Sequence, residues 1–461
     1  MDTETFTSTL VCQLEQYCSD LEETITATTW TKVIDATEIL DIGGSIVISG
    51  EQKDGFGFEI QGCLGEGGMG IVDVAKQTSL NREVAIKRSP GGENSPWVEK
   101  LLIEEAILHG QLEHPNIPPV HMLGYDSKGC PALVMRRIDG VCLKDLIKET
   151  NHAFWENVKT DRVEWLLRVL VQTCNAVDYA HSKSVLHRDI KTENIMVGPY
   201  GEVFLIDWGV AIKLDEKGEN LPKDFMGSPR YAAPEMFKEK TTLTKQTDVY
   251  LLGSTLVECL TGNPIHKGKS LVELIQCEQE LDKNDFPESV DDALLNICLR
   301  ATRNTPEERF DSAKSFRQAL ELYLKQRAAI NTLEYAYDLF DELEIEFNKE
   351  NSSAHFFQQV AFQCRFAFEE TLRQCPELVQ AHEGILDTLD LMIRFELSNG
   401  KLGYAEHLFE EFQNICNNKS RVEQLQQLIS KALLVRTKSD ELNTQIQYKL
   451  IEKLAQKSDK G

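Results

Sequence analysis

His187–Gly209 reads HRDIKTENIMVGPYGEVFLIDWG and joins a polar loop to an apolar run. The polar positions carry carboxylates at Asp189 and Asp207, an ammonium group at Lys191 and an amide at Asn194. The apolar run VFLI has the composition of a strand that leads the chain to the second carboxylate. Because polar loops on an apolar scaffold commonly position reactive groups, this stretch is a candidate active site.

The length and charge of the chain limit what surrounds this stretch. A chain of 461 residues is too long for one ordinary core and predicts about two to four domains. Hydrophobic residues make up 41% and charged residues 27%, as in globular proteins. The net charge of −25 argues against nucleic acid or an anionic membrane as the main partner.

The cysteines and the N-terminal region predict a cytoplasmic protein. Twelve cysteines are scattered without a C-x-x-C pair, which indicates neither a zinc site nor a disulfide framework. No apolar run approaches the ~18 residues that span a bilayer, and the acidic N-terminus is unlike a signal peptide. Residues 1–57 carry eleven acidic residues against two lysines and are interpreted as an acidic extension, with a helix near Leu10–Leu21 and a strand at Ser45–Ser49.

A glycine-rich stretch follows at GEGGMG. Gly65, Gly67 and Gly70 form G-x-G-x-x-G, a spacing that dinucleotide-binding folds also use. A dinucleotide site needs a helix that opens at the last glycine, whereas β-branched residues follow here. The pattern therefore favours a hairpin whose backbone can approach phosphates, with a plain glycine-rich turn as the alternative.

A lysine closes the next apolar strand, VAIK, at Lys87, where its ammonium can reach a phosphate held by the glycine loop. A predicted helix follows at Val98–Leu112. It offers Glu104 and Glu105 as ion-pair partners for the lysine, and charge alone does not choose between them.

Long helices are predicted from about Ala328 onward. Short polar turns between them suggest a small helical solenoid, with a partner-binding groove as the alternative to a simple core. The tail at 422–454 has coiled-coil character, but the polar run Arg436–Glu441 interrupts it. The expected core positions are Tyr337, Phe340 and Phe347, then Phe356, Phe366 and Leu372, then Leu389, Ile393 and Leu397.

Taken in order, these motifs resemble the bacterial Hanks-type serine/threonine protein kinases over residues 58–325. The resemblance implies an α+β, bilobal kinase fold, with a β-rich N-lobe at about 58–138 and a helical C-lobe at about 139–325. An all-α domain at 326–435, loosely similar to tetratricopeptide repeats, and a charged C-terminal helix or tail at 436–461 complete the expected architecture.

The resemblance also implies ATP and Mg²⁺ as cofactors and assigns the site residues. Asp189 is expected to accept the hydroxyl proton and Lys191 to contact the γ-phosphoryl group, while Asn194 and Asp207 bind magnesium. In the family pattern Glu105 is favoured over its neighbour as the partner of Lys87, Met135 gates the adenine pocket, and Glu235 pairs with Arg309. The residues expected around the nucleotide are Leu64, Gly65, Glu66, Gly67, Gly68, Met69, Gly70, Val72, Ala85, Lys87, Glu105, Met135 and Ile138.

The expected reaction is phosphorylation of Ser or Thr in proteins, including autophosphorylation, because HRDIK and GSPRYAAPE resemble the serine/threonine class. Docking of a protein partner or self-association is expected through the C-terminal helices, and no nucleic acid or membrane partner is expected. The alternative is a pseudokinase scaffold that acts through its helical part.

Two departures from the family pattern bear on activity. Trp208 replaces the usual phenylalanine after the metal-binding aspartate, and a bulky ring is retained. The segment Val210–Gly227 contains no Ser, Thr or Tyr. We therefore hypothesise that phosphorylation there does not switch the protein on, and that an acidic residue (Asp215, Glu216, Glu219 or Asp224) meets Arg188 instead. Phosphosite mapping tests this hypothesis.

Overall fold

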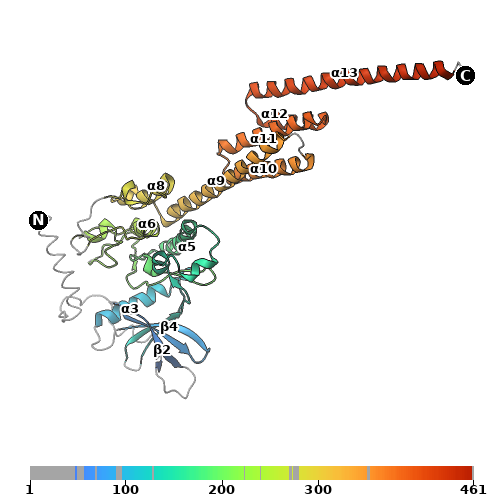
Figure 1. The fold of residues 1–461 in the computed structure, drawn as a ribbon. Helices are drawn as coiled ribbons and strands as arrows, with labels where there is room; N and C mark the ends of the chain where they lie inside the picture. The colour runs from blue at the N-terminus through green and yellow to red at the C-terminus, as the bar shows by residue number, and fades with distance from the viewer. Residues whose placement is uncertain are drawn as a thin grey trace. The chain divides into compact units, whose positions relative to one another are not determined.

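The computed structural model describes residues 47–48, 57–67, 70–89, 96–126, 129–222, 224–238, 240–268, 273, 280–349 and 353–458. They belong to two compact units, divided between Glu321 and Leu322 within one helix (Figure 1). The helix expected at Leu10–Leu21 lies outside the described residues, as do Gly68 and Met69.

The first unit begins with a sheet in the order β1-β2-β3-β4-β6-β5. β1 pairs with β2 in parallel, and the remaining neighbours are antiparallel. Strand β3 starts at the last glycine of the glycine-rich stretch, so the helix that a dinucleotide fold requires is absent there. The strands of this sheet are β1 (Val47–Ile48), β2 (Gly57–Gly67), β3 (Gly70–Gln77), β4 (Arg82–Arg88), β5 (Val120–Tyr125) and β6 (Pro131–Arg136).

Alternation along β4 and β6 gives this sheet two apolar faces. Val84 and Ile86 belong to a cluster on one face. Leu133 on the other face packs against Leu102 and Ala106 of helix α3 (Pro96–His109), which lies beside the blue sheet in Figure 1. Helix α3 is the helix predicted at Val98–Leu112. In the structure it begins two residues earlier and ends three residues earlier.

The rest of the first unit is mainly helical. Helix α6 is buried along almost its whole length. The first unit also contains two small sheets, with the strand orders β7-β9-β10 and β8-β11. The helices are α4 (Leu143–Lys148), α5 (Arg162–Ser182), α6 (Lys245–Thr261) and α8 (Asp292–Ala301), and the short strands are β7 (Val141–Cys142), β8 (Val185–Leu186), β9 (Ile195–Val197), β10 (Val203–Leu205) and β11 (Ile212–Lys213). Short 3-10 turns lie at Ala153–Asn157, Thr192–Asn194, Pro234–Phe237, Lys283–Asp285 and Pro306–Glu308.

A buried ion pair fixes the lower part of this unit. The Arg309 guanidinium donates to both carboxylate oxygens of Glu235, at 2.7 and 2.8 Å, as the family pattern predicts. It also donates to the carbonyls of Arg303, Asn304 and Gln246. Both charges are thus taken out of water with their hydrogen bonds satisfied, and removing one partner would leave the other charge unpaired.

The second unit is all helical and shares one core. Gly384 on α11 meets the ring of Phe368 on α10, where an added Cβ would lie 2.3 Å from the ring, so only glycine permits this approach. Phe357 stacks on Phe395 at 3.6 Å between ring centroids. The helices are α9 (Ala313–Phe347), which spans the division, α10 (Ala354–Gln374), α11 (Val379–Ser398), α12 (Leu402–Ile415) and α13 (Lys419–Ser458).

Two expectations for these helices differ from the structure. Phe366 was expected in the core but is 58% exposed, and Phe356 and Tyr337 are also exposed, because helical spacing does not reveal which face has a neighbour. Helix α13 continues through Arg436–Glu441 without a break, so the boundary expected between residues 435 and 436 falls inside a helix. That run is polar but contains neither glycine nor proline, and polarity alone does not end a helix.

None of the helices that the structure describes is both long and apolar enough to cross a membrane.

We expect Arg309→Met to lower the free energy of unfolding of the first unit by about 3–5 kcal/mol, because Glu235 is left charged in a buried site. Urea unfolding followed by tryptophan fluorescence measures this unit selectively, since the five tryptophans all precede residue 209. Lys283→Met, in the exposed pair with Asp292, is the control and should leave the midpoint unchanged. Equal effects of the two substitutions would contradict the prediction.

Candidate active site

A row of paired residues connects the glycine hairpin to the lysine. Gly65 on β2 pairs with Val72 on β3, Val72 pairs with Lys87 on β4, and Lys87 pairs with Leu133 on β6. Directly paired residues face the same side of a sheet, so the glycine backbone and the lysine side chain lie on one face. Two residues away from Lys87 on β4, Ala85 pairs with Met135 on β6, and this pair lies on the same face of the sheet.

Gly70 shows why the last position of the motif must be glycine. Its φ of 134° lies in a region that residues with a Cβ rarely adopt, and a Cβ there would lie 2.5 Å from the Arg88 carbonyl oxygen. The tight start of β3 against β4 therefore depends on this glycine. Leu64 and Glu66 are exposed on the β2 side of the hairpin.

Lys87 is shared by two carboxylates. Its Nζ donates to both oxygens of Glu105 on α3, at 2.9 and 2.8 Å, and to Asp207 at 2.9 Å. Glu104 instead faces solvent and approaches Lys100 at 3.9 Å. The α3 carboxylate that reaches the lysine is therefore Glu105.

The shared ammonium controls the ionisation of the site. Burial by itself would lower the pKa of Lys87, but the carboxylates of Asp207 and Glu105 hold this pKa above its usual value. Loss of water would raise the pKa of Asp207, but the Lys87 ammonium outweighs this effect and lowers it. Burial raises the pKa of Glu105 in spite of the Lys87 ammonium, so the pair in which both pKa shifts favour the charged forms is Lys87 with Asp207.

Asp189 has one carboxylate oxygen in use and one free. Its Oδ2 accepts from Lys191 Nζ at 2.7 Å and from Asn194 Nδ2 at 3.0 Å. Its Oδ1 is buried and has no hydrogen-bond partner within the described part of the chain. A buried acceptor without a donor is costly unless a ligand supplies one, so Oδ1 is positioned to accept a proton from an incoming group. Lys191 also donates to the Ser228 hydroxyl at 2.6 Å, which links this loop to GSPRYAAPE.

The residues predicted to bind metal fit a hard cation. Asn194 uses its amide nitrogen on the Asp189 carbonyl oxygen at 2.7 Å as well as on its carboxylate, which leaves the amide oxygen as a ligand. Asp207 is 38% exposed at its side chain and presents a carboxylate beside the Lys87 ammonium. Among the described residues, no three His, Cys, Asp or Glu side chains form a metal cage. One carboxylate and one amide suit Mg²⁺, which retains waters and binds phosphate oxygens.

Asp248, which the sequence analysis did not single out as a site residue, holds the loop in place. Its carboxylate lies at 0% exposure near the start of α6 and accepts the backbone N–H groups of His187 and Arg188, both at 2.9 Å, and His181 Nε2 at 2.8 Å. Arg188 has a φ of 67°, a strained conformation for a residue with a side chain. The sequence signal was a carboxylate in a mostly apolar helix, which carries one other, Glu258.

Trp208 packs the end of the site between two histidines. The indole is fully buried, with ring centroids 4.5 Å from His187 and 6.1 Å from His109, and its N–H donates to the Leu205 carbonyl at 3.2 Å. His187 accepts the Asp189 N–H at Nδ1, so its proton is on Nε2, which faces the Ile206 carbonyl oxygen. Burial lowers the pKa of His187 and keeps this ring neutral.

Among the described residues, no acidic side chain contacts Arg188 in place of a phosphate, contrary to the prediction. The Arg188 guanidinium is buried and donates to the Val210 carbonyl, and no carboxylate of the described residues lies within ion-pair distance of it. Asp215 is exposed, and its Oδ1 accepts the N–H groups of Lys217 and Glu219 in its own turn. The proposed contact of Asp215, Glu216, Glu219 or Asp224 with Arg188 is therefore wrong, because local turn bonds and exposure keep these carboxylates from it. That the activity is controlled without phosphorylation of Val210–Gly227 stays a prediction.

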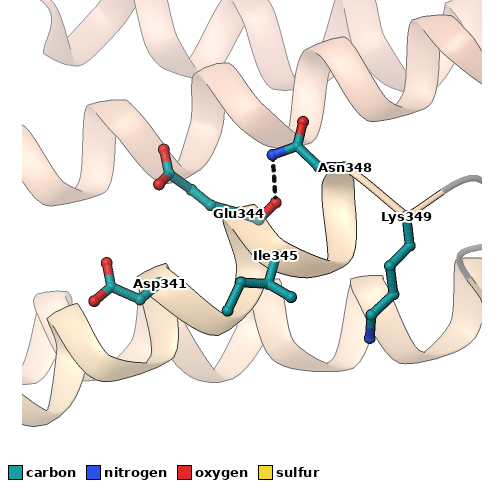
Figure 2. Close-up of a pocket in the computed structure, with 5 residues that line it drawn as sticks. All are labelled: Asp341, Glu344, Ile345, Asn348 and Lys349. Carbon is teal, nitrogen blue, oxygen red and sulfur yellow. Dashed lines mark hydrogen bonds between the residues drawn. The ribbon is translucent and has the colours of Figure 1, made fainter.

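A pocket in the second unit has a different character. Figure 2 shows Asp341, Glu344, Ile345, Asn348 and Lys349, which come from the end of α9 and the two residues after it. The Asn348 amide donates to the Glu344 carbonyl at 2.8 Å. No nucleophile and base converge there, so the candidate active site remains the one around Asp189.

Comparison with known proteins identifies the family that the first unit matches. The family model described as a protein kinase domain matches residues 58–321. The chain is 31% identical over 301 residues to serine/threonine-protein kinase PknD of Chlamydia trachomatis serovar L2b (strain UCH-1/proctitis), a match that covers 58% of this chain and 32% of that relative. It is 31% identical over 303 residues to the protein of the same name in Protochlamydia amoebophila (strain UWE25), covering 59% and 30%. The matched region thus spans about a third of these curated relatives' length.

His109 should make the first unit sensitive to acid. Burial lowers its pKa from the ordinary 6.5 to about 4, so the unfolded state takes up this proton first as the pH falls. Stability present at neutral pH is therefore lost between about pH 6.5 and 4, by up to ~3 kcal/mol for this residue. We expect His109→Gln, whose amide can still donate to the Pro118 carbonyl oxygen, to reduce that loss in urea unfolding at several pH values. The exposed His382→Gln serves as control, and an unchanged pH dependence in His109→Gln would refute the prediction.

Proposed function

Because the chain belongs to the protein kinase family, we propose that it transfers the γ-phosphoryl group of ATP to Ser or Thr hydroxyls of proteins, itself included. The observation that carries this proposal is the free, buried Oδ1 of Asp189 beside Lys191. An acceptor hydroxyl fits there as the missing donor. The glycine hairpin and Lys87, which share one face of the sheet, are groups suited to phosphates.

The proposed reaction is an in-line displacement. The acceptor oxygen forms a bond to the γ-phosphorus, the bond from that phosphorus to the bridging oxygen of ADP breaks, and the hydroxyl proton passes to Asp189. Lys191 neutralises charge on the transferring group while holding the other Asp189 oxygen. Lys87, oriented by Glu105, binds the α- and β-phosphates.

Asn194 and Asp207 are the proposed magnesium ligands. When bound, Mg²⁺ would neutralise the nucleotide phosphates and favour departure of ADP. The φ of 59° at Asp207 turns the chain sharply between β10 and the buried Trp208, and so directs this carboxylate toward Lys87. The adenine is proposed to lie against Val72, Ala85, Met135 and Ile138, with the backbone after β6 as its hinge.

The set of intact groups favours catalysis over a scaffold without activity. A pseudokinase has no need for an ammonium shared by two carboxylates or for a free buried carboxylate oxygen, each of which costs stability. For the second unit, we propose a protein-contact role, because helices of one core expose aromatic side chains such as Phe362 and Phe366.

The decisive test is incubation of the full chain with ATP labelled at the γ-phosphorus, Mg²⁺ and a protein acceptor. We expect label on Ser or Thr, and at least a ~100-fold lower rate for Asp189→Asn, which removes the proton acceptor. Asp215→Asn, at an exposed loop carboxylate, should keep the original rate. Equal incorporation by wild type and Asp189→Asn, or none by either, would reject the proposed activity.

Two adjacent glutamates provide a matched pair for the role of α3. Glu105→Gln removes the charge that orients Lys87 and should lower the rate at limiting ATP by roughly 10- to 100-fold, the value of one charged hydrogen bond. Glu104→Gln changes the same atoms one position away, on the solvent side, and should leave the rate within about twofold. A larger effect at Glu104 than at Glu105 would show that this ion pair does not support catalysis.

A further inference from the structure

The strip Ser228–Ala233, the SPRYAA of GSPRYAAPE, runs beside the proposed proton acceptor. Lys191 Nζ donates to Asp189 Oδ2 at 2.7 Å and to the Ser228 hydroxyl at 2.6 Å. The strip therefore begins two hydrogen bonds away from the Asp189 carboxylate. Its outer side is accessible, since the Arg230 side chain is exposed. A protein acceptor whose hydroxyl reaches Asp189 would pass along this strip.

Three successive backbone carbonyls of the strip are each held by a hydrogen bond. The Arg230 carbonyl accepts the backbone N–H of His266 at 3.1 Å. The Tyr231 carbonyl accepts from the Ser254 hydroxyl at 3.0 Å, and the Ala232 carbonyl accepts from His266 Nε2 at 2.9 Å. Both donor residues are buried, with Ser254 at 0% and His266 at 5% exposure. Two residues outside the strip thus fix its backbone at three consecutive positions.

The local sequence brings His266 to the strip through the end of helix α6. Gly262 ends this helix with a φ of 73°, and its N–H donates to the Glu258 carbonyl at 2.8 Å. The Thr261 hydroxyl then donates to the Asn263 carbonyl at 3.0 Å, and the Asn263 amide donates to the Thr261 carbonyl at 3.1 Å. These bonds fix the first residues after α6 and therefore the course of the chain toward His266.

The His266 ring is fixed as well as its backbone. A carbonyl oxygen can only accept, so the ring proton lies on Nε2. Burial lowers the pKa of His266, which keeps the ring neutral at neutral pH. The ring lies nearly parallel to Tyr250 of α6, with an interplanar angle of 16°, and Arg309 Cζ lies 4.8 Å from the Tyr250 ring centroid. His266 is thus packed next to the ion pair of Arg309 with Glu235, which follows the strip by two residues.

Helix α6 supports both the strip and the loop that carries Asp189. Asp248 near its start accepts the N–H groups of His187 and Arg188, and Ser254 six residues later holds the strip. Six residues of helix correspond to about 9 Å along a rigid element. The position of the strip relative to Asp189 therefore depends on the bonds that join each of them to α6 and to the residues just after it.

We propose that His266, together with Ser254, is a positioning residue for the protein acceptor. Neither side chain contacts a reacting atom in the proposed mechanism. They hold the strip, and the strip sets where the acceptor chain lies relative to Asp189. Because a displacement of about 1 Å can strongly reduce productive alignment, loosening the strip weakens use of the acceptor. This inference rests on the proposed phosphoryl transfer and names what fixes the acceptor side of the same site.

Steady-state kinetics of the full chain with labelled ATP, Mg²⁺ and a protein acceptor test this role. His266→Phe keeps a buried ring but leaves the Ala232 carbonyl without its donor. We expect KM for the acceptor to rise roughly 5- to 20-fold in this variant, while KM for ATP stays within about twofold. Ser254→Ala, which removes the donor to the Tyr231 carbonyl, should shift the acceptor KM in the same direction.

Two further variants separate positioning from a general loss of stability. His266→Gln has an amide that can still donate to the Ala232 carbonyl, so its acceptor KM should return to within about twofold of wild type. Thr173→Val removes a buried hydroxyl bond of the same kind inside α5, at 3.0 Å to the Val169 carbonyl, and should change neither KM. An acceptor KM in His266→Phe equal to that of wild type, or an equal rise in both KM values, would overturn the proposal.

Hydrogen exchange tests the strip without relying on activity. We expect amides in residues 227–236 to exchange at least about threefold faster in His266→Phe than in wild type, and near the wild-type rate in His266→Gln. Residues 187–195 should exchange as before, because Asp248 still holds that loop. The same exchange in all three chains would overturn the inference whether or not the chain is active. A wild-type chain that transfers no phosphoryl group would instead reject the proposed function, on which the acceptor role rests.

Discussion

The site depends on one ammonium group that serves two carboxylates from distant parts of the chain. Lys87 on β4 bonds Glu105 on α3 and Asp207 after β10, so a sheet, a helix and a loop must all be in place before its charge is satisfied. In a buried site an unpaired lysine is costly, and the same bonds that remove this cost also orient α3 and fix Asp207. Stability and the arrangement of reactive groups are therefore linked here: loss of any one partner weakens both.

Around this ion cluster, buried polar groups act on the backbone more than on each other. Asp248 accepts two loop N–H groups and thereby holds Arg188 in a left-handed conformation, while His187 is fixed as one tautomer by the Asp189 N–H and the Ile206 carbonyl oxygen. Asn116 secures the same region from the other side, since its amide donates to the Val203 carbonyl at 2.8 Å. These groups contact no reacting atom in the proposed mechanism, yet they decide where Asp189 points.

Local chemistry predicted individual elements of the first unit, whereas its bilobal fold was predicted from the resemblance of its motifs to a known family. The glycine spacing followed by β-branched residues indicated a hairpin, and β3 does begin at Gly70. Choices that depend on tertiary packing could not be made the same way. Charge alone did not choose between Glu104 and Glu105, and the family pattern was needed to favour Glu105. Only the structure shows that Phe366 faces solvent and that Asp215 bonds its own turn. The roles of Asp248 and His109 stayed hidden for the same reason, since their partners lie on other elements.

The distance along the chain between the groups of the site has a consequence for how the protein is made. Lys87 and Asp207 are 120 positions apart, and Asp248 follows Arg188 by 60. Contacts of such long sequence separation close late, because the entropy of the intervening loops must be lost first. During synthesis, a nascent chain would carry Asp189 well before α6 emerges to restrain it. The polypeptide therefore cannot assemble the complete site until its lower helical core has been made.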